Sequence, residues 1–87
     1  MKFGRVVGSV VATVKDERLN NIPLLLVRKV EKGKENDIIV AADATRQAGI
    51  GEFVYYIGSK EASRIFRGIL PPADAAIVGF IDTYQEN

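Results

Sequence analysis

The sequence predicts a mainly β protein, a small five-stranded, OB-like β-barrel with one short helix between the last two strands. Three observations support this fold class. Apolar residues recur mostly with a period of two, which is typical of half-buried strands. Glycines interrupt the apolar positions, as they do where the strands of small barrels coil sharply. The length of 87 residues fits one domain, which we expect to span residues 1–87.

The first predicted strand occupies residues 3–15. Gly4 and Gly8 lie at its apolar positions, so they predict a bulge or a sharp coil. The polar, turn-rich residues 15–22 end the strand. Alternation along it is clear, because the apolar and the polar positions have opposite parity: Val6, Val10, Ala12 and Val14 against Arg5, Ser9 and Thr13.

A second strand is predicted over residues 23–31 and a third over 37–42. Pro23 suits the first position of a strand, because proline cannot donate to the ladder but is tolerated where a strand begins. The charged, glycine-containing residues 32–37 predict a loop between the two strands. We expect three apolar side chains of the second strand to face one way: Leu24, Leu26 and Val30.

The fourth predicted strand, residues 53–57, is rich in aromatic and β-branched residues. A helix is predicted over residues 59–66, with Ser59 as its N-cap and Glu61 at its positive end. Its apolar stripe consists of Ala62, Ile65 and Phe66.

The helix is expected to stop at Gly68 and at the prolines that follow, Pro71 and Pro72. Residues 73–85 then supply a fifth strand, which has Gly79 in its interior. Five strands with a helix between the fourth and the fifth are consistent with a closed or partly open barrel.

Composition excludes several classes of function. The net charge is only +1 and the signs are interspersed, so the sequence lacks the basic patch of a nucleic-acid-binding protein. The longest uncharged apolar run, residues 75–81, is far shorter than the roughly 20 residues of a membrane helix. No signal-peptide core follows Lys2. We therefore expect a cytoplasmic protein with no membrane or nucleic-acid partner.

Catalytic side chains are scarce. The chain has no cysteine and no histidine, so the usual zinc ligands are missing and Ser9, Ser59 and Ser63 lack the usual proton acceptor. Lys60, at a charged helix start, is not expected to be buried enough to replace it. We predict no catalytic, cofactor-binding or metal-binding residues, and association with other chains is the remaining common way to reinforce such a small fold.

Three carboxylates lie near predicted strand ends: Asp43, Glu52 and Asp82. Two of them could converge as an acid–base pair or hold a hard cation. The alternative is that they are solvated or lie in an interface, which the sequence favours because acidic residues are common along the chain.

The loop at residues 48–52 begins Gly49-x-Gly51 and resembles a phosphate-binding loop at first sight. Such a loop must lead into a helix, whose first amides hold the anion. Here it leads into a strand, and both the Walker lysine and a third glycine are absent. Two interpretations of the glycines remain: a tight connection between strands, or a place where another backbone approaches closely.

Four segments, taken in order, resemble the vertex shell proteins of bacterial microcompartments, the EutN/CcmL family. The most specific feature is Ala42-Asp43, then the glycine-rich loop ending in Gly-Glu, then an apolar strand and Gly58-Ser59. The segments are GRVVGSVVATVK, LLLVRKVE, VAADATRQAGIGEFVYYIGSKEASR and PADAAIVGFIDT.

This resemblance implies a non-enzymatic, cofactor-free β-barrel subunit that forms a homopentamer and caps the five-fold vertices of a polyhedral shell in the bacterial cytoplasm. Hexameric and trimeric shell proteins would be its other partners. It also implies that one loop lies near the five-fold axis and its pore: Ala48, Gly49, Ile50, Gly51 and Glu52. It places three further residues at the subunit interface, with the arginine pairing across the boundary: Gly58, Ser59 and Arg64.

Two alternatives belong to other classes of function. An OB-like module for single-stranded nucleic acid would use stacking aromatic side chains in a positive groove, but the near-neutral charge argues against it. Its stacking residues would be Phe53, Tyr55 and Tyr56. A small acid–base enzyme would use Asp43 or Glu52.

Overall fold

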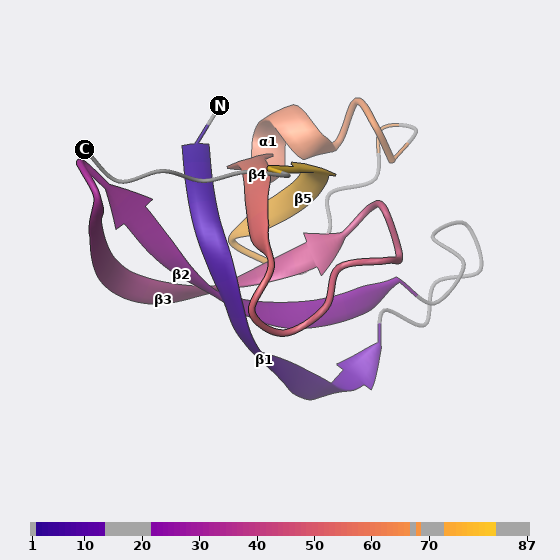
Figure 1. Ribbon diagram of the computed structural model, residues 1–87. Coiled ribbons are helices and arrows are strands. Elements are labelled where there is room, and N and C mark those ends of the chain that lie inside the picture. The colour runs from indigo at the N-terminus through magenta and orange to yellow at the C-terminus, as the bar shows by residue number, and fades with distance from the viewer. Residues whose placement is uncertain (1, 14–21, 67, 69–72, 82–87) are drawn as a thin grey trace.

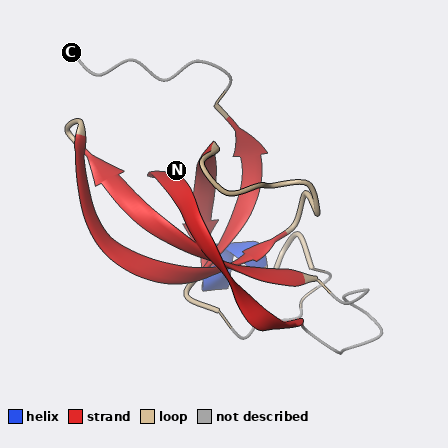
Figure 2. Cartoon of the chain, turned by 60° about the horizontal axis from the view of Figure 1, so that its bottom comes forward, coloured by secondary structure: helices blue, strands red, loops and turns tan. Residues whose placement is uncertain are grey.

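The computed structural model describes residues 2–13, 22–66, 68 and 73–81, and these residues form a closed barrel of five strands (Figure 1). The single short helix lies between the last two strands, so the predicted fold class is confirmed. In Figure 2 the strongly curved strands cross in front of this helix. The elements are β1 (Lys2–Thr13), β2 (Pro23–Glu31), β3 (Lys34–Asp43), β4 (Phe53–Gly58), α1 (Ser59–Ala62) and β5 (Ala75–Phe80).

The strand order around the barrel is β1-β2-β3-β5-β4, and β1 pairs with β4 to close it. All neighbouring strands are antiparallel except β3 and β5, which are parallel. Each of the five strands therefore has a neighbour on both sides. Closure of this kind removes the free edges at which other chains add strands.

β1 contains the irregularity that its glycines predicted. Val6 pairs with Val27 and Gly8 pairs with Leu26, so Val7 is an extra residue in the ladder. Gly4 lies at a close contact between β1 and β2, because a Cβ there would collide with Val27 Cγ1 and lie 2.9 Å from the Arg28 carbonyl oxygen. A bulge and a close approach of this kind increase the local coil of the strand.

Two apolar clusters lie on opposite faces of the sheet. Neighbouring residues of one strand belong to different clusters, because side chains alternate between the two faces of a sheet. Ala41 and Ala75 belong to the barrel interior, whereas Ala42 and Ala76 face the helix. The interior cluster consists of Val6, Leu25, Val27, Ala41, Val54, Tyr56, Ala75 and Ile77. The second cluster, under α1, consists of Ile22, Ala42, Ala62, Phe66 and Ala76.

β2 begins at Pro23, as predicted. Leu25 and Val27 occupy the barrel interior, and Leu24, one of the three side chains expected to face one way, packs against the cluster under α1. Apolar residues occupy both the odd and the even positions of this strand, so the sequence pattern does not show which face is turned toward the barrel interior.

The predicted loop over residues 32–37 is wrong, because β3 begins at Lys34. Glu31 pairs with Lys34, and only Lys32 and Gly33 form the turn, with φ of 51° and 74°. Two consecutive residues of positive φ are typical of a tight β-hairpin turn. The charged residues at the start of β3 make contacts across the strands: Arg5 Nε donates to Glu35 Oε1 (2.8 Å) and Arg28 Nη1 donates to the Asn36 carbonyl oxygen (3.3 Å).

The helix is shorter than predicted. α1 ends at Ala62, residues 63–66 continue as turns, and Gly58 rather than Ser59 is its N-cap, without a side-chain hydrogen bond. Ala62 and Phe66 are buried as expected, but Ile65 is 49% exposed. Because α1 ends at Ala62, the helical spacing that would place Ile65 on the apolar face does not extend to this residue. β5 ends at Phe80, and the predicted strand positions 14–15 and 82–85 lie outside the described residues.

Candidate functional site

Residues 44–52 connect β3 to β4 at one end of the barrel, and a single buried carboxylate organises them. Asp43 is only 1% exposed. Its Oδ1 accepts hydrogen bonds from the Thr45 amide (3.0 Å) and the Thr45 hydroxyl (2.6 Å), and its Oδ2 accepts one from the Ala48 amide (2.9 Å). An aspartate that binds the amides following it mimics a backbone turn. Asp43 therefore fixes the first half of this loop.

The second half of the loop is fixed by Glu52 and β1. The Glu52 carboxylate accepts a hydrogen bond from the Gly49 amide, and the Glu52 amide donates to the Gly49 carbonyl oxygen (3.1 Å). The Gly51 amide donates to the Val6 carbonyl oxygen (2.7 Å) and the Val6 amide donates to the Glu52 carbonyl oxygen (2.9 Å). The loop tip is thus tied to β1 beside the bulge at Val7.

The local structure of the turn explains only one of the two loop glycines. Gly51 has a φ of 92°, a conformation that L side chains rarely adopt, so the turn itself requires glycine there. Gly49 is outside the left-handed region, and a Cβ added to it would meet only Glu52 Oε1, at 3.2 Å. A flexible carboxylate can move by that amount. The turn therefore accounts for Gly51 but not for Gly49.

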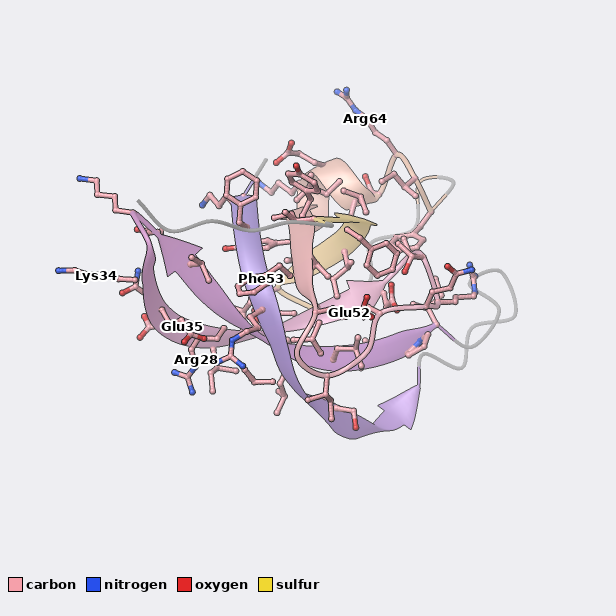
Figure 3. All side chains as sticks on the ribbon, in the orientation of Figure 1. Arg28, Lys34, Glu35, Glu52, Phe53 and Arg64 are labelled. Atoms are coloured by element: carbon pink, nitrogen blue, oxygen red, sulfur yellow. The ribbon has the colours of Figure 1, made fainter. Side chains whose placement is uncertain are left out.

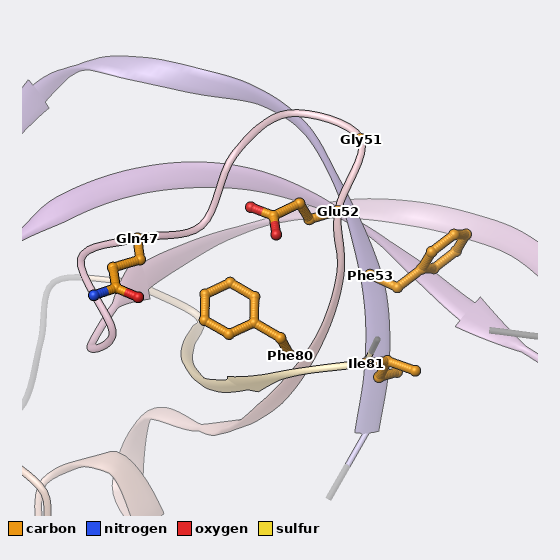
Figure 4. Close-up of a pocket in the computed structure, with 6 residues that line it drawn as sticks. All are labelled: Gln47, Gly51, Glu52, Phe53, Phe80 and Ile81. Atoms are coloured by element: carbon orange, nitrogen blue, oxygen red, sulfur yellow. The ribbon is translucent and has the colours of Figure 1, made fainter. Parts of the chain in front are cut away.

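Ile50 lies between these glycines at the tip and is 73% exposed. Beside the loop is an open hollow of about 480 Å³. Figure 4 shows Gln47 and Phe80 on one side of the descending β4 backbone and Phe53 and Ile81 on the other. The hollow is lined by Gln47, Gly51, Glu52, Phe53, Phe80 and Ile81.

The structure places the other predicted site residues at the far end of β4. The loop enters β4 at Phe53, whereas Gly58 ends the strand and Ser59 begins α1. Arg64 is exposed and extends away from the barrel (Figure 3). No hydrogen bond or ion pair joins its guanidinium to another described residue. The five residue steps from Phe53 to Gly58, at about 3.3 Å each, separate the two groups by roughly 17 Å.

The structure describes two of the three candidate acid–base residues, and both are hydrogen-bonded within their own loop. Asp43 and Glu52 each bind amides of their own loop, and Asp82 lies outside the described residues. Of the candidate nucleophiles, Ser63 donates its hydroxyl hydrogen bond to the Lys60 carbonyl oxygen (2.8 Å), and the Lys60 side chain is exposed. Among the described residues, no three acidic side chains gather where they could hold a metal ion.

The aromatic residues do not form a stacking platform either. Tyr56 is 4% exposed and belongs to the barrel interior, where burial raises the pKa of its hydroxyl and the Glu31 carboxylate adds to the effect. Tyr55 packs instead against Phe3, with ring centroids 5.1 Å apart. A buried tyrosine cannot stack on a base, so the alternative of an OB-like nucleic-acid module loses one of its three residues.

Sequence reasoning missed the hollow, because its lining comes from three segments that only the barrel brings together. Ile50 carried a usable signal: a large apolar residue between two glycines, at a turn, is not a core position. The part of the chain that the structure describes includes no helix long and apolar enough to cross a membrane.

Comparison with known proteins gives concordant results. The family model described as "Ethanolamine utilisation protein EutN/carboxysome" matches residues 1–82. The microcompartment shell vertex protein PduN of Salmonella typhimurium is 38% identical over 89 aligned positions, which cover 95% of this chain and 97% of PduN.

Solved structures agree with this match. The carboxysome protein CcmL of Nostoc is 36% identical, with a TM-score of 0.76 over 97% of this chain and 92% of CcmL. The pentameric microcompartment shell protein GrpN of Rhodospirillum rubrum is 36% identical, with a TM-score of 0.73 over 98% of both chains.

Proposed function

Because this chain belongs to the EutN/CcmL family, we propose that it is a structural vertex subunit of a bacterial microcompartment, which forms pentamers and caps the five-fold corners of the shell. One observation carries the proposal: relatives that match nearly the whole chain are shell vertex proteins, and one that matches 98% of it is pentameric. Its role is geometric and non-enzymatic, in the bacterial cytoplasm.

Five copies in a ring would bring the loop 48–52 close to the symmetry axis. The loop is suited to this position, because its amides donate hydrogen bonds to the Asp43 and Glu52 carboxylates and to the Val6 carbonyl oxygen, which hold it in one conformation. Gly49 supports the proposal most directly. Its lack of a side chain has no explanation in the φ of this turn, and a close approach of neighbouring backbones would supply one.

Arg64 and the start of α1 would serve the ring at the other end of β4. The Arg64 guanidinium is exposed and has no carboxylate partner among the described residues, which leaves it available to a neighbouring subunit. Arginine is favoured at interfaces because its planar guanidinium can donate two parallel hydrogen bonds to one carboxylate. With Gly58 and Ser59 beside it, the proposed interface runs along the length of β4.

The outer rim of the pentamer would contact hexameric and trimeric shell proteins. In cells that make the shell, deletion of this subunit should leave open or elongated shells around intact cargo enzymes, seen by electron microscopy. Shells that close normally without it would contradict the proposed function.

A substitution at Gly49 tests the position of the loop. Gly49→Ala should leave the fold of the subunit intact but weaken the ring about tenfold or more, since an added methyl in a packed contact costs about 1–3 kcal/mol. Gly79→Ala is the matched control, because its new Cβ would lie 3.7 Å from Tyr55 Cδ2, an ordinary contact. Equal ring stability in both variants, measured by native mass spectrometry on dilution, would exclude the loop from the subunit contact.

A further inference from the structure

Ile50 belongs to neither of the two apolar clusters that the described residues form. It is the most exposed large hydrophobic residue of the described chain, at 73%, compared with 40% for Phe3, 45% for Ile38 and 49% for Ile65. Its flanking residues bind other parts of the loop and β1, so the side chain is held outward on a braced tip. A single exposed apolar side chain is common on protein surfaces, so Ile50 indicates an interface only together with the hollow beside its loop.

The hollow beside the loop has a mixed apolar and polar lining. Phe53, Phe80 and Ile81 are its apolar residues, and Gln47 and Glu52 lie on the same side of the β4 backbone as Phe80 (Figure 4). Ile50 of the same chain does not line it. The hollow and the exposed tip share the loop residues Gly51 and Glu52, so any neighbour that meets this loop also lies near the hollow.

In a cyclic ring, one patch of each subunit meets a different patch of the next, and the contact repeats until the ring closes. We propose that Ile50 of each subunit inserts into the hollow of the adjacent copy, against its Phe53, Phe80 and Ile81. This inference rests on the proposed pentamer and adds the specific contact that joins its subunits near the axis. Ile50 would then be an interface anchor rather than a side chain that lines the central pore.

Cysteine pairing tests this contact directly, because the chain contains no cysteine. Chains with Ile50→Cys and chains with Ile81→Cys, carrying tags of different mass, are co-expressed, purified as rings and oxidised. Only disulfides between subunits can join the two kinds of chain. We expect a cross-linked species with both tags, the same result when Gln47→Cys replaces Ile81→Cys, and little cross-linking in rings of Ile50→Cys alone.

Other outcomes would overturn the inference. Efficient cross-linking in rings of Ile50→Cys alone would show that the five side chains meet one another at the axis. If rings of five form but cross-link in none of these combinations, the inserted Ile50 contact is refuted and the proposed function is unaffected. If the unsubstituted protein does not form a ring at all, the proposed function fails first.

A second measurement avoids the geometry of disulfides. Ile50→Ser should raise the concentration at which rings dissociate by about ten- to a hundredfold, since it removes the burial of a large aliphatic side chain. Ile38→Ser on β3 is the matched control, with 45% exposure, and should leave ring dissociation unchanged. Both variants should unfold at the same denaturant concentration as the parent when measured as separated subunits. An unchanged ring in Ile50→Ser would contradict the inserted contact.

Discussion

At the residue scale, one buried carboxylate decides the shape of the proposed axis loop. Asp43 accepts three hydrogen bonds with its two oxygens, from Thr45 and Ala48. Such a group stabilises a fold only while every partner is present, because an unsatisfied buried group keeps its full desolvation cost. The position therefore tolerates little change, although it contributes no catalytic chemistry.

Asp43→Asn should lower the free energy of unfolding by about 1–3 kcal/mol, because the amide nitrogen cannot accept one of these hydrogen bonds. Urea denaturation measures the loss. Asp37→Asn is the matched control, since Asp37 is exposed on β3 and its replacement should change stability by less than about 0.5 kcal/mol. Equal stability of the two variants would mean that Asp43 does not hold the loop.

Tyr56 predicts how stability depends on pH. Its pKa is raised above the ordinary value of 10.0 by burial and then by the Glu31 carboxylate. Above about pH 10 the unfolded chain loses the phenolic proton while the folded chain retains it, so the free energy of unfolding falls as pH rises. Below pH 10 this contribution is constant.

Tyr56→Phe should therefore flatten the loss of stability above about pH 10, as measured by denaturant unfolding at each pH. Tyr55→Phe serves as the control and should keep the steep loss, because Tyr56 remains in place. If both variants lose stability as steeply as the parent, another group governs the alkaline limit.

At the element scale, the hairpin between β2 and β3 carries a residue in an unfavourable conformation. Lys32 has a φ of 51° and is followed by Gly33 with a φ of 74°. Left-handed backbone costs a residue with a side chain roughly 1–2 kcal/mol, and asparagine tolerates it best. Asn-Gly is the most favoured pair for a two-residue hairpin.

Lys32→Asn should raise the free energy of unfolding by roughly 0.5–1 kcal/mol, in thermal or urea unfolding. Lys34→Asn is the control within β3, where asparagine is disfavoured, and it should bring no gain. A loss of stability in Lys32→Asn would show that the lysine makes a contact that outweighs its backbone strain.

Much of the element order was predictable from local pattern. Period-two alternation located the strands, Pro23 marked the start of β2, and Gly4 and Gly8 indicated the irregularity in β1. Contacts made by distant residues were not predictable. The polar residues 34–36 looked like a loop, but Glu35 pairs with Val30 across the hairpin and accepts a hydrogen bond from Arg5, which lies 30 residues away in the sequence. Ile65 was expected on the apolar face of the helix because the helix was predicted to have two turns, whereas it has one.

The candidate site was also predictable only in part. The glycine pattern located the loop 48–52, and the failure of its phosphate-binding context was correctly predicted from the strand that follows. The buried role of Asp43 and the hollow were not predictable, because each depends on how the barrel closes. Whether Gly58, Ser59 and Arg64 touch a neighbour stays a prediction.

At the scale of the whole molecule, closure of the barrel restricts how the subunit can associate. All five strands have two neighbours, so strand addition at an edge is not available within the described barrel. Association must use side chains and loops, which are what the exposed Ile50, the adjacent hollow and Arg64 provide. A chain of 87 residues has a small core, and a ring would add to its stability.

The measurement that tests the central claim most directly is the native mass of the purified protein, by native mass spectrometry and light scattering at several concentrations and salt levels. Five copies of a 9.5 kDa chain give a ring of about 48 kDa, and the account predicts this species across the range. A protein that remains a 9.5 kDa monomer under every condition would contradict it.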